Sequence, residues 1–332
     1  MRKQFLVKLI SNIITCVGNI YGNNDSYTSC VQAMNEVSLR EVNQHPDYQV
    51  LRRVPTSLTA KQNSDLKEFI ATIIDLETMG LDASKNEIIE LGLLSISFST
   101  TDGILEVVDT YNELNDPSKP IPPEVTKVTG IRDRDVQGKS INWDFVLQVL
   151  NKTHLVICHN SGFDRNFLEL QTPQAIRAVI ESMLFACTIK DIDWKERGYE
   201  SSKLDYLNWK LGFFYDGHRA LNDCWATLNL LLQEQGAFDE LKKNVRKKET
   251  LLSAQNAPFD KKDLLKERNY RWADGLGRLP KGWWICLPNE MVADEKRWLD
   301  DEIYNLEGAS NSVPQCEITA RKRYSFRAEE LP

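Results

Sequence analysis

The chain has 332 residues, of which 42% are hydrophobic and 27% are charged. This is the composition of an ordinary globular protein and excludes a disordered, collagen-like or coiled-coil chain. At about 150 residues per domain, the length predicts roughly two domains. The 48 acidic residues outnumber the 41 basic ones and give a formal charge of −7. A general DNA-coating protein is therefore excluded, and any nucleic-acid contact must come from a local basic patch.

The cysteines and the N-terminus predict a cytoplasmic protein. Seven scattered cysteines form no C-x-x-C pair, which favours reduced thiols over a disulfide framework or a zinc site. The basic, partly apolar start is interrupted by Lys8 and Asn12 and has no cleavage-site pattern, so we expect no signal peptide. No run approaches the ~20 apolar residues of a membrane helix, and we expect no membrane contact.

The first half of the chain predicts an N-terminal arm followed by strands. Residues 1–65 are polar and weakly patterned, with at most a short helix, and should form a peripheral arm. The β-branched run at 69–74 predicts a central strand. Runs at 88–98 and 104–111 predict two more strands, which Asp102-Gly103 should join as a hairpin.

Helices and a further strand follow and complete an α/β domain over residues 66–238. Apolar positions recur at helical spacing in several segments, and a short apolar run predicts another buried strand. The predicted helices are 122–128, 143–150, 163–170 and 220–232, and the predicted strand is 154–158. Three strands followed by alternating helices and strands favour a mixed sheet flanked by helices.

Residues 239–332 differ in character and predict a second, small α+β domain. Residues 240–290 hold twelve Lys/Arg against seven Asp/Glu, and Lys242 to Lys248 indicate a linker or a helix end. We expect a helix over 261–268 capped by Asp260, and another helix over 295–304. A two-stranded ribbon should join 270–272 to 282–287. Four of the eight tryptophans also lie here: Trp272, Trp283, Trp284 and Trp298.

Two carboxylates follow the first predicted strand. In an extended chain residues i and i+2 point to the same side, so Asp75 and Glu77 should project together from an apolar strand. Neighbouring carboxylates repel and are costly to bury unpaired, and Mg²⁺ or Mn²⁺ relieves both problems. The alternative is a helix N-cap followed by a surface acid.

Two later segments supply further candidates for chemistry. Asp164 lies at the start of a predicted helix, directly after a strand, where a carboxylate can also be a simple helix cap. His218 and Asp223 lie at the start of the last strongly apolar helix. Taken singly, His218 reads as a surface histidine and Asp223 as a satisfied polar residue.

Taken together, these segments resemble the three motifs of the DEDDh exonuclease family. Asp-x-Glu at 75–77, His-Asn-x-x-Phe-Asp at 159–164 and His-x-Ala-x-x-Asp at 218–223 occur in order over about 150 residues. The resemblance covers roughly residues 69–233. It includes Val-Thr-Lys-Val-Thr-Gly-Ile at 125–131, which is similar to the segment that borders the terminal nucleotide in the family. The family includes the proofreading (epsilon) subunit of bacterial replicative polymerases, ribonuclease T and oligoribonuclease.

The resemblance implies a ribonuclease H-like fold and two-metal hydrolysis from the 3′ end, releasing nucleoside 5′-monophosphates. It implies two Mg²⁺ or Mn²⁺ ions, with Asp75 shared between them. Glu77 and Asp223 would complete one site, and Asp164 would support the other. His218 would take a proton from the attacking water, a role that suits a group with an ordinary pKa of ~6.5. The remaining motif positions imply substrate contacts by Thr78, Met79, His159, Asn160 and Phe163.

Met79 departs from the family pattern, which usually has threonine at this position. Backbone amides of this turn normally meet the 3′-terminal hydroxyl in the family, and a changed side chain need not disturb them. The Met79 side chain could pack on the terminal base or sugar instead, which affects substrate preference rather than activity.

The C-terminal part resembles a small domain appended to some bacterial epsilon-like exonucleases. Its aromatic and basic mixture suits a platform for single-stranded nucleic acid. The alternative is that the tryptophans form a small core and the lysines a solvated face. Because every candidate catalytic residue lies upstream, the sequence also predicts that turnover of short oligonucleotides survives removal of residues beyond about Lys242.

The leading functional hypothesis is a metal-dependent 3′→5′ exonuclease acting on single-stranded or frayed DNA, in repair or in trimming of the proofreading type. The alternatives are an RNA exonuclease and a non-catalytic nucleic-acid-binding module. The partner is therefore nucleic acid, with a polymerase or repair protein possible. The absence of a G-x-x-x-x-G-K-[ST] loop argues against a helicase.

Overall fold

The computed structural model describes residues 42, 44–62 and 67–329, which separate into two units. Most of the expected N-terminal arm lies outside these residues. In the smaller unit, β1 (Arg52–Arg53) pairs in parallel with β7 (Phe213–Phe214), and the Arg53 guanidinium lies 4.8 Å from the centre of the Phe214 ring. The larger unit comprises 54–211 and the chain from Tyr215 onward.

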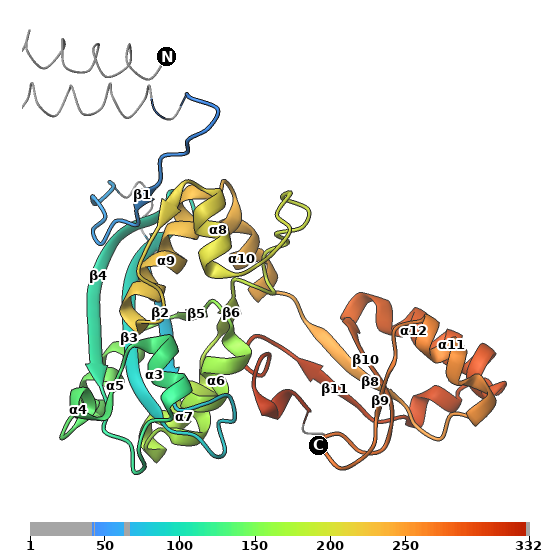
Figure 1. Ribbon diagram of the computed structural model, residues 1–332. Helices are drawn as coiled ribbons and strands as arrows, with labels where there is room; N and C mark the ends of the chain where they lie inside the picture. The colour runs from blue at the N-terminus through green and yellow to red at the C-terminus, as the bar shows by residue number, and fades with distance from the viewer. Residues whose placement is uncertain (1–41, 43, 63–66, 330–332) are drawn as a thin grey trace, which may run out of the picture. The chain divides into compact units, whose positions relative to one another are not determined.

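A five-stranded mixed sheet forms the centre of the larger unit (Figure 1). The strand order is β4-β3-β2-β5-β6; β3 runs antiparallel to β2 and β4, whereas β5 and β6 run parallel to β2. This order confirms the ribonuclease H-like mixed sheet and the predicted hairpin. The strands are β2 (Phe69–Thr78), β3 (Ile88–Ser99), β4 (Gly103–Leu114), β5 (Leu155–Cys158) and β6 (Phe185–Cys187).

Helices cover both faces of this sheet, as the alternating pattern predicts. Ile74 and Leu76 of β2 belong to the largest buried apolar cluster, to which α5, α6 and α7 contribute. The opposite face of β2 and β3 packs against α9. The helices are α3 (Pro123–Thr129), α4 (Asp133–Val136), α5 (Trp143–Lys152), α6 (Ser161–Gln171), α7 (Gln174–Ser182), α8 (Leu204–Lys210), α9 (Ala220–Gln233) and α10 (Ala237–Val245).

Gly92 allows α9 to approach the sheet closely. It lies opposite Asp75 in the β2–β3 register. A Cβ at Gly92 would come within 2.5 Å of the Ala220 carbonyl carbon, a backbone atom of α9. The Cys224 thiol also approaches the carbonyl oxygens of Ile73 and Gly92 at 3.6 and 3.5 Å. The absence of a side chain at residue 92 therefore sets the distance between the start of α9 and the strand that carries Asp75.

The chain from Glu249 builds a second, four-stranded antiparallel sheet with order β11-β8-β10-β9. The predicted ribbon of β9 and β10 is confirmed, but the sequence reading missed β8 and β11. The elements are β8 (Glu249–Ala254), α11 (Lys262–Glu267), β9 (Arg271–Ala273), β10 (Gly282–Pro288), α12 (Val292–Trp298) and β11 (Gln315–Ile318). Short 3-10 helices are η1 (Phe259–Lys261), η2 (Asn289–Met291), η4 (Ala309–Ser312) and η5 (Phe326–Glu329), and η3 (Leu299–Tyr304) is a π-helix.

One local prediction in this part needs correction. Asp260 does not cap α11, because it lies within η1 and no side chain caps this helix. Of the two alternatives for Lys242 to Lys248, the helix end is confirmed, because Lys242 to Val245 form the last turn of α10 and Arg246 follows as its C-cap. The expected helix over 295–304 is present as α12 and η3.

The tryptophans of this part mainly build its core. Trp284 is 4% exposed, and Trp283 and Trp298 pack half-buried against the cluster around Leu252 and Leu265. Trp272 differs, since 51% of it remains exposed while its ring packs edge-on against Trp283 at 5.3 Å. The core interpretation therefore holds for three tryptophans and leaves Trp272 as an exposed aromatic surface.

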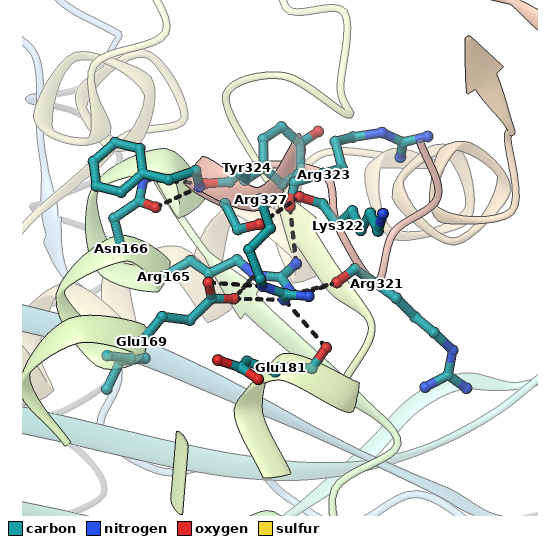
Figure 2. A network of polar contacts seen from close by, with 12 residues as sticks. Arg165, Asn166, Glu169, Glu181, Arg321, Lys322, Arg323, Tyr324 and Arg327 are labelled. Atoms are coloured by element: carbon teal, nitrogen blue, oxygen red, sulfur yellow. Dashed lines mark hydrogen bonds and ion pairs between the residues drawn. The ribbon is translucent and has the colours of Figure 1, made fainter. Parts of the chain in front are cut away.

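Residues 319–329, which we call the return segment, run from β11 back to α6 and β6 (Figure 2). The Arg165 side chain of α6 is fully buried and donates to the carbonyl oxygens of Ala320, Arg321 and Arg323 at 3.1, 2.5 and 2.8 Å. The Phe185 amide of β6 also donates to Ala320, at 3.0 Å. The polypeptide that ends the C-terminal part is thus built into the exonuclease-like sheet, and removing it cannot be expected to spare that sheet.

Candidate active site

Three carboxylates meet where β2 faces the start of α9. Asp75, Glu77 and Asp223 each offer an oxygen, and these oxygens lie within 4.8 Å of one another. Asp75 and Glu77 are two residues apart on β2 and point away from the face that carries Ile74 and Leu76. Asp223 lies in the first turn of α9. The structure therefore brings together three residues that the sequence predicts to act together.

Asp164 is buried next to this group, on α6. Its Oδ1 accepts a hydrogen bond from the Leu76 amide at 3.2 Å, which ties the helix to the middle of the Asp-x-Glu segment. Its negative charge also raises the pKa of Asp75. All four predicted acidic residues consequently share one electrostatic environment.

Burial raises the pKa of every one of these carboxyls, and repulsion by neighbouring carboxylates adds to the rise for Asp75, Glu77 and Asp164. Desolvation is the main cause, and it raises the pKa of Glu77 to about 8, of Asp164 to about 8 and of Asp223 to about 6. The pKa of Asp75 is raised well above its usual value by burial and by the charges of Asp164 and Asp223. Such a set of hard oxygen donors, short of positive charge, fits a divalent cation of the Mg²⁺ or Mn²⁺ type.

His218 precedes α9 on an exposed loop. Its backbone is in the left-handed region with φ 61°, directly after Gly217. The electrostatic influence of His218 and a hydrogen bond from its backbone N–H both lower the pKa of Asp223, although desolvation dominates and leaves that pKa raised. The histidine is thus solvent-accessible beside the carboxylate group, as a proton acceptor must be.

Two groups that the sequence analysis missed fix the start of α9. Glu90 of β3 is fully buried, accepts from the Ala220 amide at 3.1 Å and pairs with the Arg219 guanidinium at 2.8 Å. The Tyr215 hydroxyl donates to Asp223 Oδ1 at 3.2 Å. The sequence did contain a signal for this contact, because Glu90 is a glutamate inside the apolar run 88–98. A carboxylate in a core needs a partner to stay charged, so its position indicates a buried ion pair.

His159 is held by its neighbours rather than turned toward a ligand. Its Nε2 lies 2.8 Å from the Ser202 carbonyl oxygen and its Nδ1 lies 2.7 Å from the Thr188 hydroxyl. Desolvation lowers the pKa of His159 to about 4, so the ring is neutral near pH 7 and carries one proton. Because a carbonyl can only accept, that proton is on Nε2 and the Thr188 hydroxyl donates to Nδ1.

Thr78 and Met79 are also engaged by the fold. The Thr78 hydroxyl donates to the Gly80 carbonyl at 2.6 Å. The Met79 side chain is 8% exposed and packs with Ile89, Ile121 and Ile131, while its amide donates to Glu87 at 2.9 Å. The Met79 amide is therefore occupied within the fold, in contrast to the family pattern, and its side chain packs in a core cluster rather than lying exposed to a base.

Asn160 and Phe163 differ from these residues because they line an open cavity of about 490 Å³. The cavity is bordered on one side by Leu81, which is 89% exposed, and lies next to Asp164 through the first turn of α6. Of the five predicted substrate-contacting residues, Asn160 and Phe163 therefore border open space beside the carboxylates.

The raised pKa values predict that the cation-free protein loses stability as pH rises. A carboxyl with a folded-state pKa above its unfolded value stabilises the fold at low pH, and this contribution is lost as pH rises through the folded pKa. We expect the free energy of unfolding, measured in urea, to fall by about 2 kcal/mol between about pH 6.8 and 8.5. This window lies above the ordinary pKa of a histidine, so the titration of His159 contributes little to the change. Added Mg²⁺ should reverse the loss because it binds the folded state.

Glu77→Gln should flatten this profile, because it removes a group with a pKa of about 8. Asp82→Asn is the matched control, since Lys85 and Ser84 lower the pKa of Asp82 to about 2, outside the window. Equal cation-free stability at both ends of the window would contradict the prediction.

A group of half-buried and buried carboxylates that could hold a divalent cation lies where a strand of the mixed sheet meets a flanking helix. Residues 72–231 match the family model RNase_T, described as Exonuclease, so this part of the chain is similar to exonuclease domains of that family. The match spans β2 to α9 and so includes all four acidic residues and His218.

The chain is also similar to curated DNA polymerases and to solved exonucleases. It is 27% identical over 233 residues to a PolC-type DNA polymerase III of Thermotoga petrophila and 26% identical over 252 residues to one of Streptococcus thermophilus. These alignments cover 68% and 66% of this chain but only 16% of each relative. The chain thus spans about a sixth of the length of these relatives.

Among solved structures, exonuclease X in complex with 5′-overhanging duplex DNA is 22% identical, with a TM-score of 0.37, covering 52% of this chain and 92% of that one. E. coli exonuclease I in complex with an oligonucleotide is 15% identical, with a TM-score of 0.43, covering 67% and 64%. Likeness at this level carries no inference about what this chain binds.

Two further expectations can be compared with the residues that the structure describes. None of the helices described is long and apolar enough to cross a membrane. Of the cysteines in this part of the chain, Cys158, Cys187, Cys224, Cys286 and Cys316 are all free.

Proposed function

We propose that the protein is a metal-dependent 3′→5′ exonuclease that removes nucleoside 5′-monophosphates from single-stranded or frayed DNA. The observation that carries this proposal is the group formed by Asp75, Glu77 and Asp223 within an exonuclease domain, with Asp164 buried beside it. A binding-only module would have no need to gather two buried and two half-buried carboxyls, because such a group costs stability.

Each acidic residue has a role in this proposal. Asp75, Glu77, Asp164 and Asp223 would hold Mg²⁺ or Mn²⁺, with two ions per site. Bound ions supply electrostatic stabilisation of the attacking and leaving oxygens of the phosphate. Glu90, Arg219 and Tyr215 are positioning residues, since they fix the start of α9 and the orientation of Asp223.

His218 is proposed to take the proton from the attacking water. It is exposed and lies five residues before Asp223, at the mouth of the carboxylate group. The proposal assigns the terminal nucleotide to the neighbourhood of Thr78, Met79, His159, Asn160 and Phe163. Within that set His159, Thr78 and Met79 would shape the site through their internal bonds, whereas Asn160 and Phe163 would touch the nucleotide.

DNA is the proposed substrate because the curated relatives are DNA polymerases, and a polymerase or repair protein is the corresponding proposed partner. RNA is the second candidate. The carboxylate group acts on the phosphate and does not by itself distinguish a ribose from a deoxyribose, for which a contact to the 2′-hydroxyl is needed.

The test is a degradation time course on single-stranded DNA labelled at its 5′ end. We expect a ladder that shortens from the 3′ end, with nucleoside 5′-monophosphates as product, in the presence of Mg²⁺ or Mn²⁺ and no cleavage in excess chelator. Asp75→Asn, purified in parallel, controls for contaminating nucleases. Full activity in chelator, or an active Asp75→Asn variant, would sink the proposal.

The same time course with matched DNA and RNA oligonucleotides decides the substrate. We expect faster cleavage of DNA than of RNA and of single strands than of blunt duplex. A preference for RNA of about tenfold or more would replace DNA with RNA as the substrate and leave the chemistry unchanged.

A further inference from the structure

The return segment brings an aromatic ring to the cavity beside the active site. Phe326 lines the cavity of about 490 Å³ that Asn160 and Phe163 also line. It is 163 residues beyond Phe163 in sequence (326 − 163) and comes from the C-terminal part of the chain. The wall of this cavity is therefore shared between the exonuclease domain and a segment outside its family match.

Polar contacts on both sides fix the backbone position of Phe326, and Figure 2 shows the Asn166, Glu169 and Arg327 side chains that take part. The Phe326 amide donates to Asn166 Oδ1 at 2.8 Å. The next residue, Arg327, pairs with Glu169 at 2.8 Å, and Asn166 and Glu169 both belong to α6, the helix that carries Asp164. The ring is thus held in place relative to the helix of the active site.

Phe326 also connects this cavity to a second hollow. The Arg278 guanidinium lies 3.7 Å from the centre of the Phe326 ring. Arg278 in turn lines a hollow of about 340 Å³ together with Trp272, the tryptophan that is 51% exposed. Phe163, Phe326, Arg278 and Trp272 consequently form a series of aromatic and cationic groups that begins at the first turn of α6, the turn that also carries Asp164, and we call it the aromatic track.

We propose that the aromatic track beyond Phe163, from Phe326 to Trp272, binds the single-stranded part of the substrate upstream of the nucleotide being removed, with Phe326 as a base-stacking residue. This inference rests on the proposed nuclease function. Unpaired bases stack on aromatic rings whatever their sequence, and a guanidinium stacks on rings and also binds phosphate. A duplex hides its base faces, so the track selects single strands.

The test compares Phe326→Ala, Phe326→Leu and Phe326→Trp on two substrates. One is a single-stranded DNA of about 12 nucleotides, long enough to follow the track. The other is the p-nitrophenyl ester of thymidine 5′-monophosphate, which carries a terminal nucleoside and a phosphodiester but no upstream base. The Phe326→Leu variant keeps apolar bulk and removes only the aromatic face, and melting temperatures report whether each variant is folded.

We expect Phe326→Ala and Phe326→Leu to raise the KM and the Kd for the oligonucleotide by about 5- to 50-fold, since stacking on one ring contributes that much. Phe326→Trp should restore tight binding. Turnover of the p-nitrophenyl ester should stay within about twofold of wild type. Phe259→Ala is the matched control. Phe259 is 81% exposed, and the Lys262 ammonium lies 4.3 Å from the centre of its ring, but Phe259 lines neither hollow.

Two results would overturn the inference. One is wild-type oligonucleotide affinity in folded Phe326→Ala and Phe326→Leu proteins. The other is an equal loss on both substrates, which would make Phe326 a support for α6 only. Binding is measured in chelator, so that no cleavage occurs. A wild-type protein that binds the oligonucleotide through Phe326 but cleaves neither substrate when the metal ion is present would contradict the proposed function and leave the aromatic track supported.

Discussion

Gly92→Ala should lower turnover at least about 100-fold although it changes no carboxylate. The added Cβ would lie 2.5 Å from the Ala220 carbonyl carbon and 2.6 Å from the Leu221 nitrogen, where ordinary contact begins at 3.4 Å. Because these are backbone atoms, α9 must retreat by about 1 Å. Asp223 would move with it away from Asp75, and displacements of about this size can cost about 10²-fold in rate.

The readouts are turnover of the p-nitrophenyl ester and binding of Mn²⁺ by titration. Both should fall in Gly92→Ala while the melting temperature shows a folded protein. Gly277→Ala is the matched control, since a Cβ there meets no atom within 4 Å. Near wild-type turnover in Gly92→Ala would show that the approach of α9 to β3 does not set the carboxylate geometry.

Removal of residues 319–332 should prevent the exonuclease domain from folding, contrary to the expectation from sequence that this part is dispensable for turnover. The deletion takes away the three carbonyl oxygens that accept from Arg165, whose side chain is fully buried. It also takes away Arg327, one of the two partners of Glu169. Tyr324, which packs against the main apolar cluster, would be lost as well.

Arg165→Met tests the same network in the full chain. It removes the guanidinium that donates to all three carbonyls and pairs with Glu169, and disrupting a buried charge network typically costs about 3–5 kcal/mol. Urea unfolding should show a loss of that size. Arg134→Met is the matched control, because the Arg134 side chain is 72% exposed and its Nε lies 3.7 Å from Asp135 Oδ1 in a surface ion pair. This variant should change the free energy of unfolding by less than about 0.5 kcal/mol. Equal stability of both variants would contradict this account.

Elements with strong local patterns could be predicted from sequence. β-branched apolar runs form β2 and β5 because such residues fit a sheet buried on both faces. The spacing of Asp75 and Glu77 places both on one side of β2, since a strand alternates its side chains. The strands β8 and β11 were missed because both are short, and they are extended because they pair with each other in the folded chain.

Four of the five strands of the first sheet and the four acidic residues could be predicted from local properties of the chain, namely alternation, apolar runs and carboxylate spacing. The fifth strand, β6, was missed because its three residues carry too short a pattern. Tertiary structure alone decided the approach of α9 at Gly92, the burial of Glu90 and the return segment. Arg165 and its acceptors are more than 150 residues apart and read in sequence as solvated charges. A buried guanidinium satisfied by distant backbone carbonyls has no local pattern, because its energy depends on desolvation and hydrogen bonds that exist only after the chain has folded.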